Sequence, residues 1–391
     1  MPIRPSAAST KGRKSRRLAF AGVLGALAAS ALVLSACSSS PSSSTTSTTS
    51  TSSTASLSSL EKWPTASVSL QETGSSLLYP LFNLWVKQIE TSWPNVSITT
   101  AATGSGTGIS SAGAGTVNIG ASDAYLSPAE NTEYPDLENI PLAISGQMVN
   151  YNVPGVTGHL NLDGAVLAGI YNGTITNWNN SQIAALNPGV TLPNLTIIPV
   201  HRSDSSGDTF LFSSFLYDSD PTGWTVSPGT TVSWPTVAGA VAAQGNGGMV
   251  TACKANPGCV AYIGISYQAQ ALSAGLGYAA LKNEAGNYEL PTQATFSDEA
   301  AGYATKTPAS GTLSMIYGSA TDGYPIVNYE YAIVPTKQPS ALDAQTVKAV
   351  LAWAIDPDNG NSPTYLDQVG FVALPSQVEA ISAKLISKVS S

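Results

Sequence analysis

The chain has 391 residues, with 16 Lys and Arg against 24 Asp and Glu, and a formal net charge of −8 at pH 7. Residues 1–36 contain six of the basic residues and no acidic one, so the rest of the chain has ten basic against 24 acidic residues, a charge of −14. Because nucleic acids are bound by clustered positive charge, this acidic chain without basic clusters is not expected to bind them.

The N-terminus has the pattern of an export signal. Basic residues precede the apolar run LAFAGVLGALAASALVL (18–34), and small residues follow it. Such a run is short for a membrane span and typical of a secretory signal peptide, which we predict over residues 1–36. The pair Arg16-Arg17 is compatible with twin-arginine export, and the ordinary secretory route fits equally well.

The end of this segment, LSAC (34–37), resembles a bacterial lipobox. The resemblance implies that Cys37 is the lipidated N-terminus of an exported protein held at the outer face of the cytoplasmic membrane. A plain signal peptide with an incidental cysteine is the alternative. Residues 38–59 are almost entirely Ser and Thr and cannot bury enough apolar surface to offset the loss of chain entropy. We therefore predict a disordered tether over residues 37–62 and a folded part from residue 63.

From residue 63 on, strand and helix patterns alternate. Alternating apolar residues predict strands, and apolar residues at helical spacing predict helices. The expected strands include 66–71, 139–155 (running into a turn), 196–200 and 324–335, with a further strand from 96; the expected helices include 77–93, 163–173, 180–189, 210–219, 343–355 and a segment after Pro375. A short helix precedes a strand within 107–124, and a strand precedes a turn or helix within 260–272. The recurring order of strand, small-residue loop and helix indicates an α/β fold.

Two cysteines, Cys253 and Cys259, lie close together in CKANPGC. In an exported protein such a pair around Pro257-Gly258 is typical of a small-loop disulfide. Metal binding is the alternative, but only His159 and His201 could complete a site with these cysteines. We therefore expect a disulfide and no bound metal.

Three loops of small residues each follow a predicted strand and precede a predicted helix: TGSSLL (73–78), TGSGTGIS (103–110) and SDSSGDTF (203–210). A helix start offers unpaired N–H groups and the positive end of the helix dipole, so it can bind an anion. Taken singly, each loop is more typical of helix capping. Three of them in one chain, one beside Arg202, favour an anion site.

None of these loops has the pattern of a nucleotide-binding loop. The chain contains no G-x-x-x-x-G-K-[ST], and GSGTG (104–108) misses the dinucleotide fingerprint by one position. We therefore expect neither ATP nor NAD, and no cofactor of another kind is indicated. A G-x-S-x-G nucleophile elbow is also absent from the sequence.

The stretch HRSDSSGD (201–208) contains every residue type of a Ser-His-Asp catalytic site. The members of such a triad come from separated parts of a chain, because each must approach one point from its own direction. His159 is the only other histidine. The stretch therefore does not predict a hydrolase, and we expect the chain not to be an enzyme.

Four segments together resemble one family: GASDA (120–124), LDGAVLAGIYNGTITNWNNSQIAALNPG (162–189), the frame HRSDSSG–TF–F (201–212) and CxxxxxCVAYIGIS (253–266). This family is the phosphate-binding lipoproteins of the Pst-type bacterial phosphate ABC transporters, and the resemblance covers nearly all of the chain after the tether. It implies a two-lobed periplasmic-binding-protein fold of type II, with the ligand in the cleft between the lobes. It further implies a monomer that binds phosphate with high affinity and delivers it to membrane permease subunits.

The resemblance also implies which residues belong to which part. One lobe is expected to contain 63–147 and 322–391, and the other 148–321. The positions that match the family's phosphate ligands are Ser76, Leu77 (through its N–H), Ser105, Asp123, Arg202, Ser206, Gly207 and Asp208 (through its N–H). Asp204 matches an aspartate that holds the arginine in place.

The chain departs from the family at two of these positions. Position 77 is usually aromatic and position 208 is usually Thr, whose hydroxyl is a further donor; here they are Leu77 and Asp208. We expect the N–H of Asp208 to bind the ligand while its carboxylate turns away, toward Arg202 or the helix start. These departures keep open a binding protein or sensor for another oxyanion.

The carboxylate of Asp123 can lie beside a phosphate ion if the ion donates a hydrogen bond to it. A carboxylate only accepts hydrogen bonds, and hydrogen phosphate still has an O–H to donate, whereas sulfate has none near neutral pH. A site built around such a group can reject an analogue without it by roughly 10⁴–10⁵-fold. A secreted phosphatase is the remaining alternative, but it would normally show a metal cluster or a cysteine nucleophile.

Overall fold

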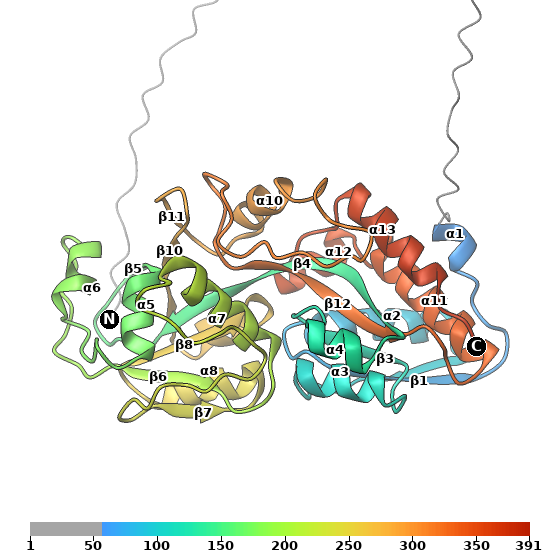
Figure 1. The fold of residues 1–391 in the computed structure, drawn as a ribbon, viewed down its shortest axis with the longest axis horizontal. Coiled ribbons are helices and arrows are strands. Elements are labelled where there is room, and N and C mark those ends of the chain that lie inside the picture. Colours follow the sequence, from blue (N-terminus) through green and yellow to red (C-terminus); the bar gives the residue numbers. More distant parts are fainter. Residues whose placement is uncertain (1–56) are drawn as a thin grey trace, which may run out of the picture. The chain divides into compact units, whose positions relative to one another are not determined.

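The computed structural model describes residues 57–391 (Figure 1). The predicted signal peptide (1–36), the lipidation site Cys37 and the tether up to residue 56 lie outside the described residues. Within residues 57–391, no helix is both long enough and apolar enough to cross a lipid bilayer.

A nine-stranded sheet runs through the described part of the chain. Its order is β2-β1-β3-β12-β4-β8-β6-β7, and β9 pairs with β4. The strands are β1 (Val68–Gly74), β2 (Val96–Thr99), β3 (Ile119–Ser122), β4 (Leu137–Tyr151), β6 (Ile198–Arg202), β7 (Val241–Ala243), β8 (Cys259–Gly264), β9 (Gly277–Tyr278) and β12 (Val327–Pro335). Each end of the sheet has three parallel strands, and the antiparallel strands β12 and β4 lie between the two trios.

The long strand β4 joins the two lobes. Its first part, up to Gly146, lies opposite β12, and from Gln147 onward it lies opposite β8. We call the part built on β1, β2, β3 and β12 the first lobe, and the part built on β6, β7 and β8 the second lobe (Figure 1). The residue limits expected for the lobes, 63–147 with 322–391 and 148–321, stay predictions.

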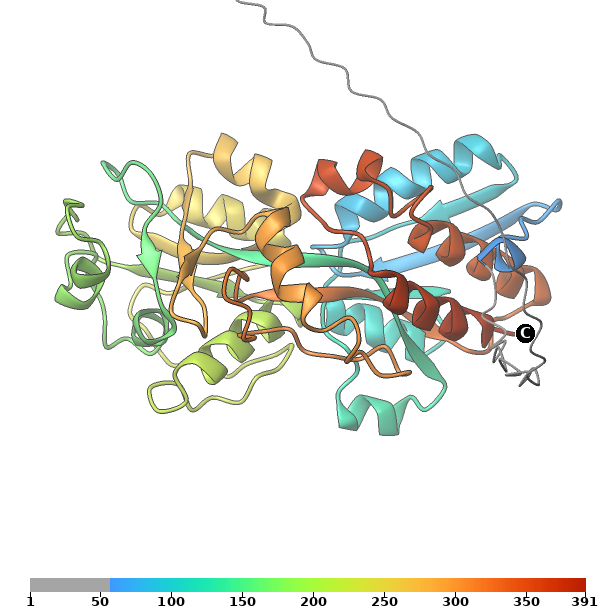
Figure 2. The same ribbon diagram turned by 90° about the horizontal axis from the view of Figure 1, so that it is seen from above.

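Helices lie on both faces of the sheet (Figure 2). They are α1 (Leu57–Leu60), α2 (Tyr79–Ser92), α3 (Ser105–Gly113), α4 (Pro128–Glu133), α5 (Gly164–Tyr171), α6 (Ser181–Leu186), α7 (Gly207–Ser219), α8 (Gly245–Ala255), α9 (Gln268–Ser273), α10 (Gln293–Ala301), α11 (Ala341–Ile355), α12 (Pro363–Val369) and α13 (Ser376–Ser387), with a 3₁₀ turn, η1 (Ile265–Tyr267), before α9. The fold is therefore α/β, as the sequence predicts.

A second, small sheet has the order β11-β10-β5. It consists of β5 (Asn161–Leu162), β10 (Ala280–Lys282) and β11 (Tyr288–Glu289). Strands of two or three residues have no readable periodicity, which is why the sequence did not predict them.

One prediction about the tether is wrong. Residues 57–60, placed in the disordered segment, form the helical turn α1, and Leu57 and Leu60 pack against the core. Their partners are on α11 and α13. Trp63 then stacks on Trp93, with 3.7 Å between ring centroids. The folded part thus includes residues that a composition rule assigned to the tether, because two leucines in a Ser-rich stretch are enough to bind it to the core.

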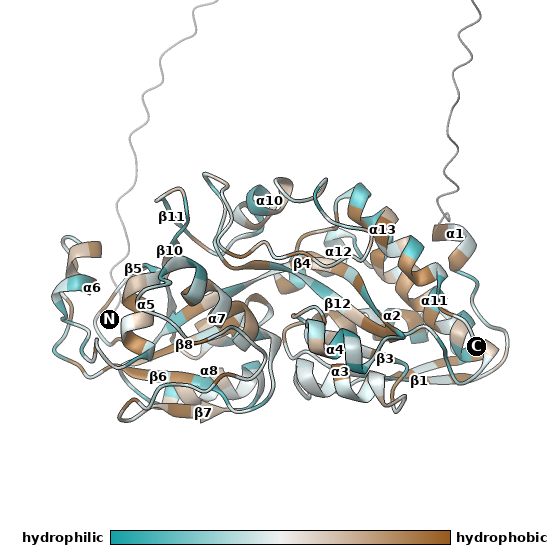
Figure 3. Ribbon diagram, in the orientation of Figure 1, coloured by the Kyte–Doolittle hydropathy of each residue, from teal (hydrophilic) through white to brown (hydrophobic). Residues whose placement is uncertain are grey.

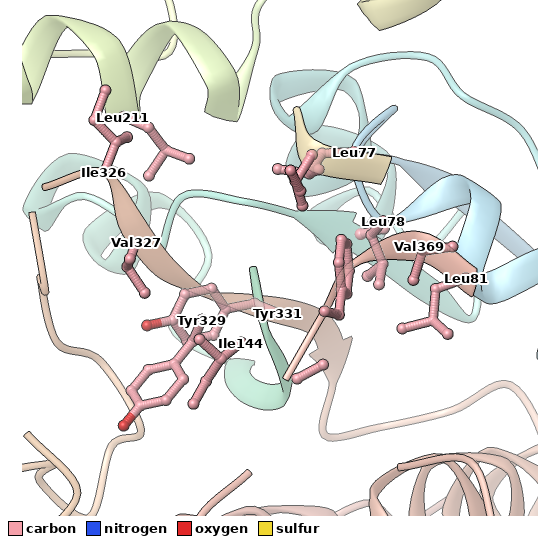
Figure 4. Packing of buried hydrophobic residues seen from close by; sticks show 14 of the residues in the cluster. Leu77, Leu78, Leu81, Ile144, Leu211, Ile326, Val327, Tyr329, Tyr331 and Val369 are labelled. Atoms are coloured by element: carbon pink, nitrogen blue, oxygen red, sulfur yellow. The ribbon is translucent and has the colours of Figure 1, made fainter. Parts of the chain in front are cut away.

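Apolar residues gather in β6, β7 and α11, whereas α4 and α10 are largely hydrophilic (Figure 3). Figure 4 shows how the interior is filled near the junction of the lobes, where Leu78, just before α2, and Leu81 within it lie near Val369 of α12, and Leu77 lies farther from Val369. These leucines are buried. The helix that follows β1 is therefore fixed by its apolar face, and its N-terminus is held at the edge of the sheet.

The expected disulfide is confirmed. Cys253, in the last turns of α8, is bonded to Cys259, the first residue of β8. Both cysteines are fully buried. The bond therefore fixes the C-terminal end of α8 against the strand that follows it.

We predict that the double variant Cys253→Ser/Cys259→Ser unfolds more easily than the wild-type protein. A cross-link that closes so short a loop is worth about 2 kcal/mol of free energy of unfolding. Urea unfolding of the two proteins would measure the difference. Wild-type protein treated with a reductant should behave like the variant, and equal stability of all three samples would contradict the prediction.

Candidate anion-binding site

The predicted site residues come together where parallel strands end. The carboxyl ends of β1, β3, β6 and β7 lead into Ser75, Asp123, Ser203 and Gln244. The two sets of parallel strands run in opposite directions, so their carboxyl ends face each other at the junction of the lobes, near Gly146 and Gln147. The carboxyl ends of parallel strands are where ligands commonly bind in α/β proteins. Helices α2, α3, α7 and α8 begin beside these segments, so their unpaired N–H groups lie at the same junction.

Arg202, the last residue of β6, lies at the centre of this group and is only 4% exposed. Its Nε donates to Oδ1 of Asp204 at 2.7 Å, Nη2 donates to the second oxygen of Asp204, and Nη1 donates to Oδ2 of Asp208 at 2.7 Å. Burial works against the charged guanidinium, but the two aspartates outweigh it and raise the pKa of Arg202. These bonds use three of the five N–H groups of the arginine, so two remain for another partner.

Asp204 takes the position that a brace for the arginine requires. Burial alone would raise its pKa, but the hydrogen bonds from Arg202 and from the N–H of Gly245 lower it. Asp204 also packs closely on Gly104 of the first lobe, where an added Cβ would lie only 2.7 Å from Oδ2 of Asp204. Asp204 is therefore an ionised group that fixes Arg202 in one orientation.

The carboxylate of Asp208 turns to Arg202, as expected. Its Oδ2 accepts from Nη1 of Arg202 and from Nδ2 of Asn246, both at 2.7 Å, and its Oδ1 accepts from Nε2 of Gln147 at 3.0 Å. Asp208 is completely buried. Burial raises its pKa, while Arg202 and the two amides oppose that effect. Asp208 is thus a second counter-ion of the arginine.

Asp123, Ser105 and Gly207 lie together across the two lobes. Ser75 donates a short hydrogen bond to Oδ1 of Asp123, and Ser105 Oγ lies 3.4 Å from Oδ2. A Cβ at Gly207 would lie 2.5 Å from Asp123 Oδ2 and 2.7 Å from Ser105 Oγ. Only a glycine at the start of α7 permits this approach.

The proton affinity of Asp123 is unusual for a carboxyl group. Burial and the charge of Asp208 raise its pKa to about 7, although hydrogen bonds from Glu330 and Ser75 and the charge of Arg202 act in the opposite direction. Asp123 therefore holds a proton more readily than an exposed carboxyl group does.

Ser76 and Leu77 also make contacts between the two lobes. Ser76 Oγ accepts from the N–H of Asn246 at 3.1 Å and from its Nδ2 at 3.0 Å. The side chain of Leu77 is buried and packs so closely on Gly264 that a Cβ there would lie only 2.4 Å from it. The carbonyl of Leu77 accepts a hydrogen bond from Ser266 Oγ at 2.7 Å. Leu77 can thus serve a ligand only through its backbone, which fits its predicted role.

Ser206 caps helix α7. Its Oγ accepts from the N–H of Thr209 at 3.4 Å, and Ser206 N donates to the carbonyl of Thr230 at 2.8 Å. The hydroxyl still has its hydrogen available as a donor. The capping interpretation and the ligand interpretation of this serine are therefore compatible.

Four residues of this group were missed in the sequence: Ser75, Gln147, Asn246 and Glu330. For Asn246 a signal existed, because QGNGG (244–248) is a fourth loop of small residues before a helix. Glu330 is the one acidic residue of the otherwise largely apolar strand β12 and could have been noticed as a buried acid. Ser75 lies in the candidate loop TGSSLL, in which only Ser76 and Leu77 were assigned to the ligand. Gln147 carries no local signal, since only the pairing of strands brings it here.

His201 lies outside this group. Its ring stacks on Trp234 with 5.4 Å between centroids, and His159 lies against Tyr278. Neither histidine forms an ion pair or hydrogen bond with an aspartate in residues 57–391. The arrangement is therefore not that of a Ser-His-Asp triad. The described residues also contain no group of three His, Cys, Asp or Glu placed to hold a metal ion.

The fold defines a two-lobed binding protein. A sequence model described as "PBP superfamily domain" matches residues 36–358. The phosphate-binding protein PstS of Xylella fastidiosa is 31% identical over 81% of this chain and 85% of that protein, and the PstS of Methanocaldococcus jannaschii is 30% identical over 83% and 87%. A phosphate-binding protein from Stenotrophomonas maltophilia has a similar crystal structure, with a TM-score of 0.61, 21% identity and coverage of 82% of this chain and 94% of that one. The chain belongs to the PstS family of phosphate-binding proteins.

We predict that Gly207→Ala separates the two lobes. The new methyl group would overlap Asp123 and Ser105, and relieving such overpacking costs about 1–3 kcal/mol. Small-angle X-ray scattering should show a larger radius of gyration than for the wild type. Gly247→Ala is the matched control, since its Cβ would meet only an ordinary contact at 3.7 Å. Identical scattering of all three proteins would contradict the prediction.

Proposed function

We propose that this protein binds inorganic phosphate and delivers it to the membrane permease subunits of an ABC transporter. The observation that carries the proposal is Arg202, buried among helix starts, braced by Asp204 and left with two free N–H groups. A guanidinium in this state can donate to two oxygens of one anion. The relatives from Xylella fastidiosa and Methanocaldococcus jannaschii, which are named phosphate-binding proteins, support the same ligand.

We propose that the ligand groups are those that the resemblance implied. Neutral donors surround the arginine, which allows an acidic protein to bind an anion through local dipoles. Ser76 supports this assignment. Its Oγ accepts hydrogen bonds from Asn246, so the hydroxyl hydrogen of Ser76 remains available to the ligand. The proposed set is Ser76, Leu77, Ser105, Asp123, Arg202, Ser206, Gly207 and Asp208, with Leu77 and Asp208 acting through their N–H groups.

Asp123 is the proposed reader of the phosphate proton. As an acceptor it would bind the O–H of hydrogen phosphate and would face sulfate unpaired. Its place opposite Gly207 puts the carboxyl at the junction of the two lobes. Hinged closure of the lobes, with residues 63–147 and 322–391 moving against 148–321, would then hide the ligand from water.

The remaining parts of the proposal concern the whole chain. Export, lipid on Cys37 and attachment to the outer face of the cytoplasmic membrane are supported by the pattern of residues 1–62. We also propose that the protein works as a monomer without a cofactor and catalyses no reaction. These three parts of the proposal are supported by the proposed ligand residues, which all come from one chain and are accounted for by a binding site.

The function is tested by calorimetric titration of the purified protein, stripped of phosphate, with phosphate, arsenate and sulfate. We expect tight binding of phosphate, binding of arsenate because it has the same shape and an ionisable O–H, and no measurable binding of sulfate. Tight binding of sulfate would favour a receptor for another oxyanion. Absence of phosphate binding would refute the proposal.

A second titration tests Asp123. In Asp123→Asn the amide can donate a hydrogen bond to sulfate as well as accept one from phosphate. The ratio of the affinities for phosphate and sulfate, which can reach about 10⁴–10⁵ in such a site, should therefore fall. The ratio of the two dissociation constants is the readout. Asp358→Asn, at an exposed position of the first lobe, is the control. An unchanged ratio would show that Asp123 does not read the proton.

A further inference from the structure

The buried site has more negative than positive side chains. Arg202 faces three aspartates, Asp123, Asp204 and Asp208, and Glu330 lies behind Asp123. All but Asp204 are almost fully buried. In residues 57–391 no lysine forms an ion pair with any of these carboxyl groups, since the lysine ion pair in that part joins Lys388 to Glu138. One arginine therefore serves the whole group.

The charge of Arg202 is already divided between two partners. Asp204 holds Nε and Nη2, and Asp208 holds Nη1 at 2.7 Å with no exposure of its side chain. With both aspartates ionised, this trio carries a net charge of −1 before any ligand arrives. A dianion entering here would be repelled at low local dielectric, where unscreened charges interact strongly.

Neighbours on the other elements do not supply the missing positive charge. The groups that face Asp208 are Gln147 of β4, Asn246 of α8, Tyr262 of β8 and Tyr267 of η1. The amides are neutral, and burial raises the pKa of both tyrosines, that of Tyr267 to about 12, so these are neutral too. Protons on the acids are the remaining way to reduce the negative charge.

Glu330, the acid behind Asp123, is held by neutral hydrogen-bond donors. Ser145 Oγ lies 2.9 Å from Oδ1 of Asn328 and 2.5 Å from Oε1 of Glu330. The amide of Asn328 cannot be turned round, since its Nδ2 donates to the carbonyls of Asp123 and Tyr329. Nδ2 of Asn328 also donates to Oε1 of Glu330 at 3.2 Å, so Glu330 accepts from two neutral groups and has no cation beside it among the described residues. Burial and the charge of Asp123 raise the pKa of Glu330, although the hydrogen bonds from Ser145 and Asn328 act in the opposite direction, so the neutral form of this acid is favoured.

We propose that phosphate enters this site together with a proton, so that the protein prefers the monoanion, and that the ion pair of Asp208 with Arg202 causes the preference. The inference rests on the proposed function, because it names the form of phosphate that the same site accepts. With a threonine at position 208, Asp204 would be the only counter-ion of Arg202. The positive charge of the arginine would then be less neutralised and would attract a dianion more strongly. Asp208 is thus a specificity-determining residue that acts through Arg202.

The direction of the pH dependence follows from linkage. When binding takes up a proton, the affinity is full at low pH and is lost as pH rises, by about 10-fold per pH unit for each proton. The dissociation constant for phosphate should therefore rise by at least about 10-fold between about pH 6 and about pH 8. A site indifferent to the form of phosphate would show a nearly constant value.

The test is calorimetric titration of the whole protein with inorganic phosphate across this pH range, in buffers with different ionisation enthalpies. The dependence of the heat on the buffer counts the protons taken up, and we expect net uptake above neutral pH. Asp208→Asn and Asp208→Thr should flatten the pH dependence and bind phosphate more tightly than the wild type at the alkaline end. Glu138→Gln, which removes a carboxylate paired with Lys388 outside the site, is the matched control and should keep the wild-type dependence.

The outcomes separate this inference from the proposed function. No phosphate binding at any pH would refute the function itself. Tight binding whose affinity does not change with pH and releases no buffer heat in the wild type would overturn the inference and leave the function intact. A steep dependence that survives in Asp208→Asn would show that Asp208 is not its cause. The pH dependence of the wild-type protein is measured independently of the variants, so it tests the inference even if either variant fails to fold.

Discussion

The structure of the site depends on one buried guanidinium shared by two aspartates. Arg202 can stay charged away from water only because Asp204 and Asp208 accept its hydrogen bonds. Those aspartates bring in further contacts: Asp204 binds the N–H of Gly245, and Asp208 binds Gln147 and Asn246. Asn246 in turn reaches Ser76 in the first lobe. The position of the helices around the site and the contact between the lobes thus follow from the need to satisfy one cation.

The sequence was sufficient to predict the elements that are long or that end at a distinctive loop. Helix α2 shows its apolar face in LLYPLFNLWVKQI, and α7 begins at the serine and glycine that cap it. The loop that holds Ser105 and the loop that follows Arg202 were predicted because Gly and Ser follow strands there, whereas Asp123 was assigned through the family resemblance. Local chemistry decides such features, so they can be predicted from a few neighbouring residues.

The contacts made through the sheet could not be predicted in this way. Glu330 lies beside Asp123 because β12 runs antiparallel to β3 with Tyr331 opposite Ser122. Gln147 reaches Asp208 because β4 passes from β12 to β8 at that residue. Such neighbours are set by the order of strands, which alternating apolar residues do not encode. The turn α1 was missed for the opposite reason, since the composition of a segment was allowed to outweigh two leucines within it.

The passage of β4 through both lobes limits how this protein can change during evolution. Side chains alternate between the faces of a strand, so one residue inserted before Gly146 would exchange the faces of everything that follows in the strand. Met148 and Val149 lie on opposite sides of β4, and both are buried, so the exchange would disturb helices on both sides of the sheet. Length changes are therefore expected to accumulate among the surface loops around α6 and β11, while the fifteen residues of β4 keep their number.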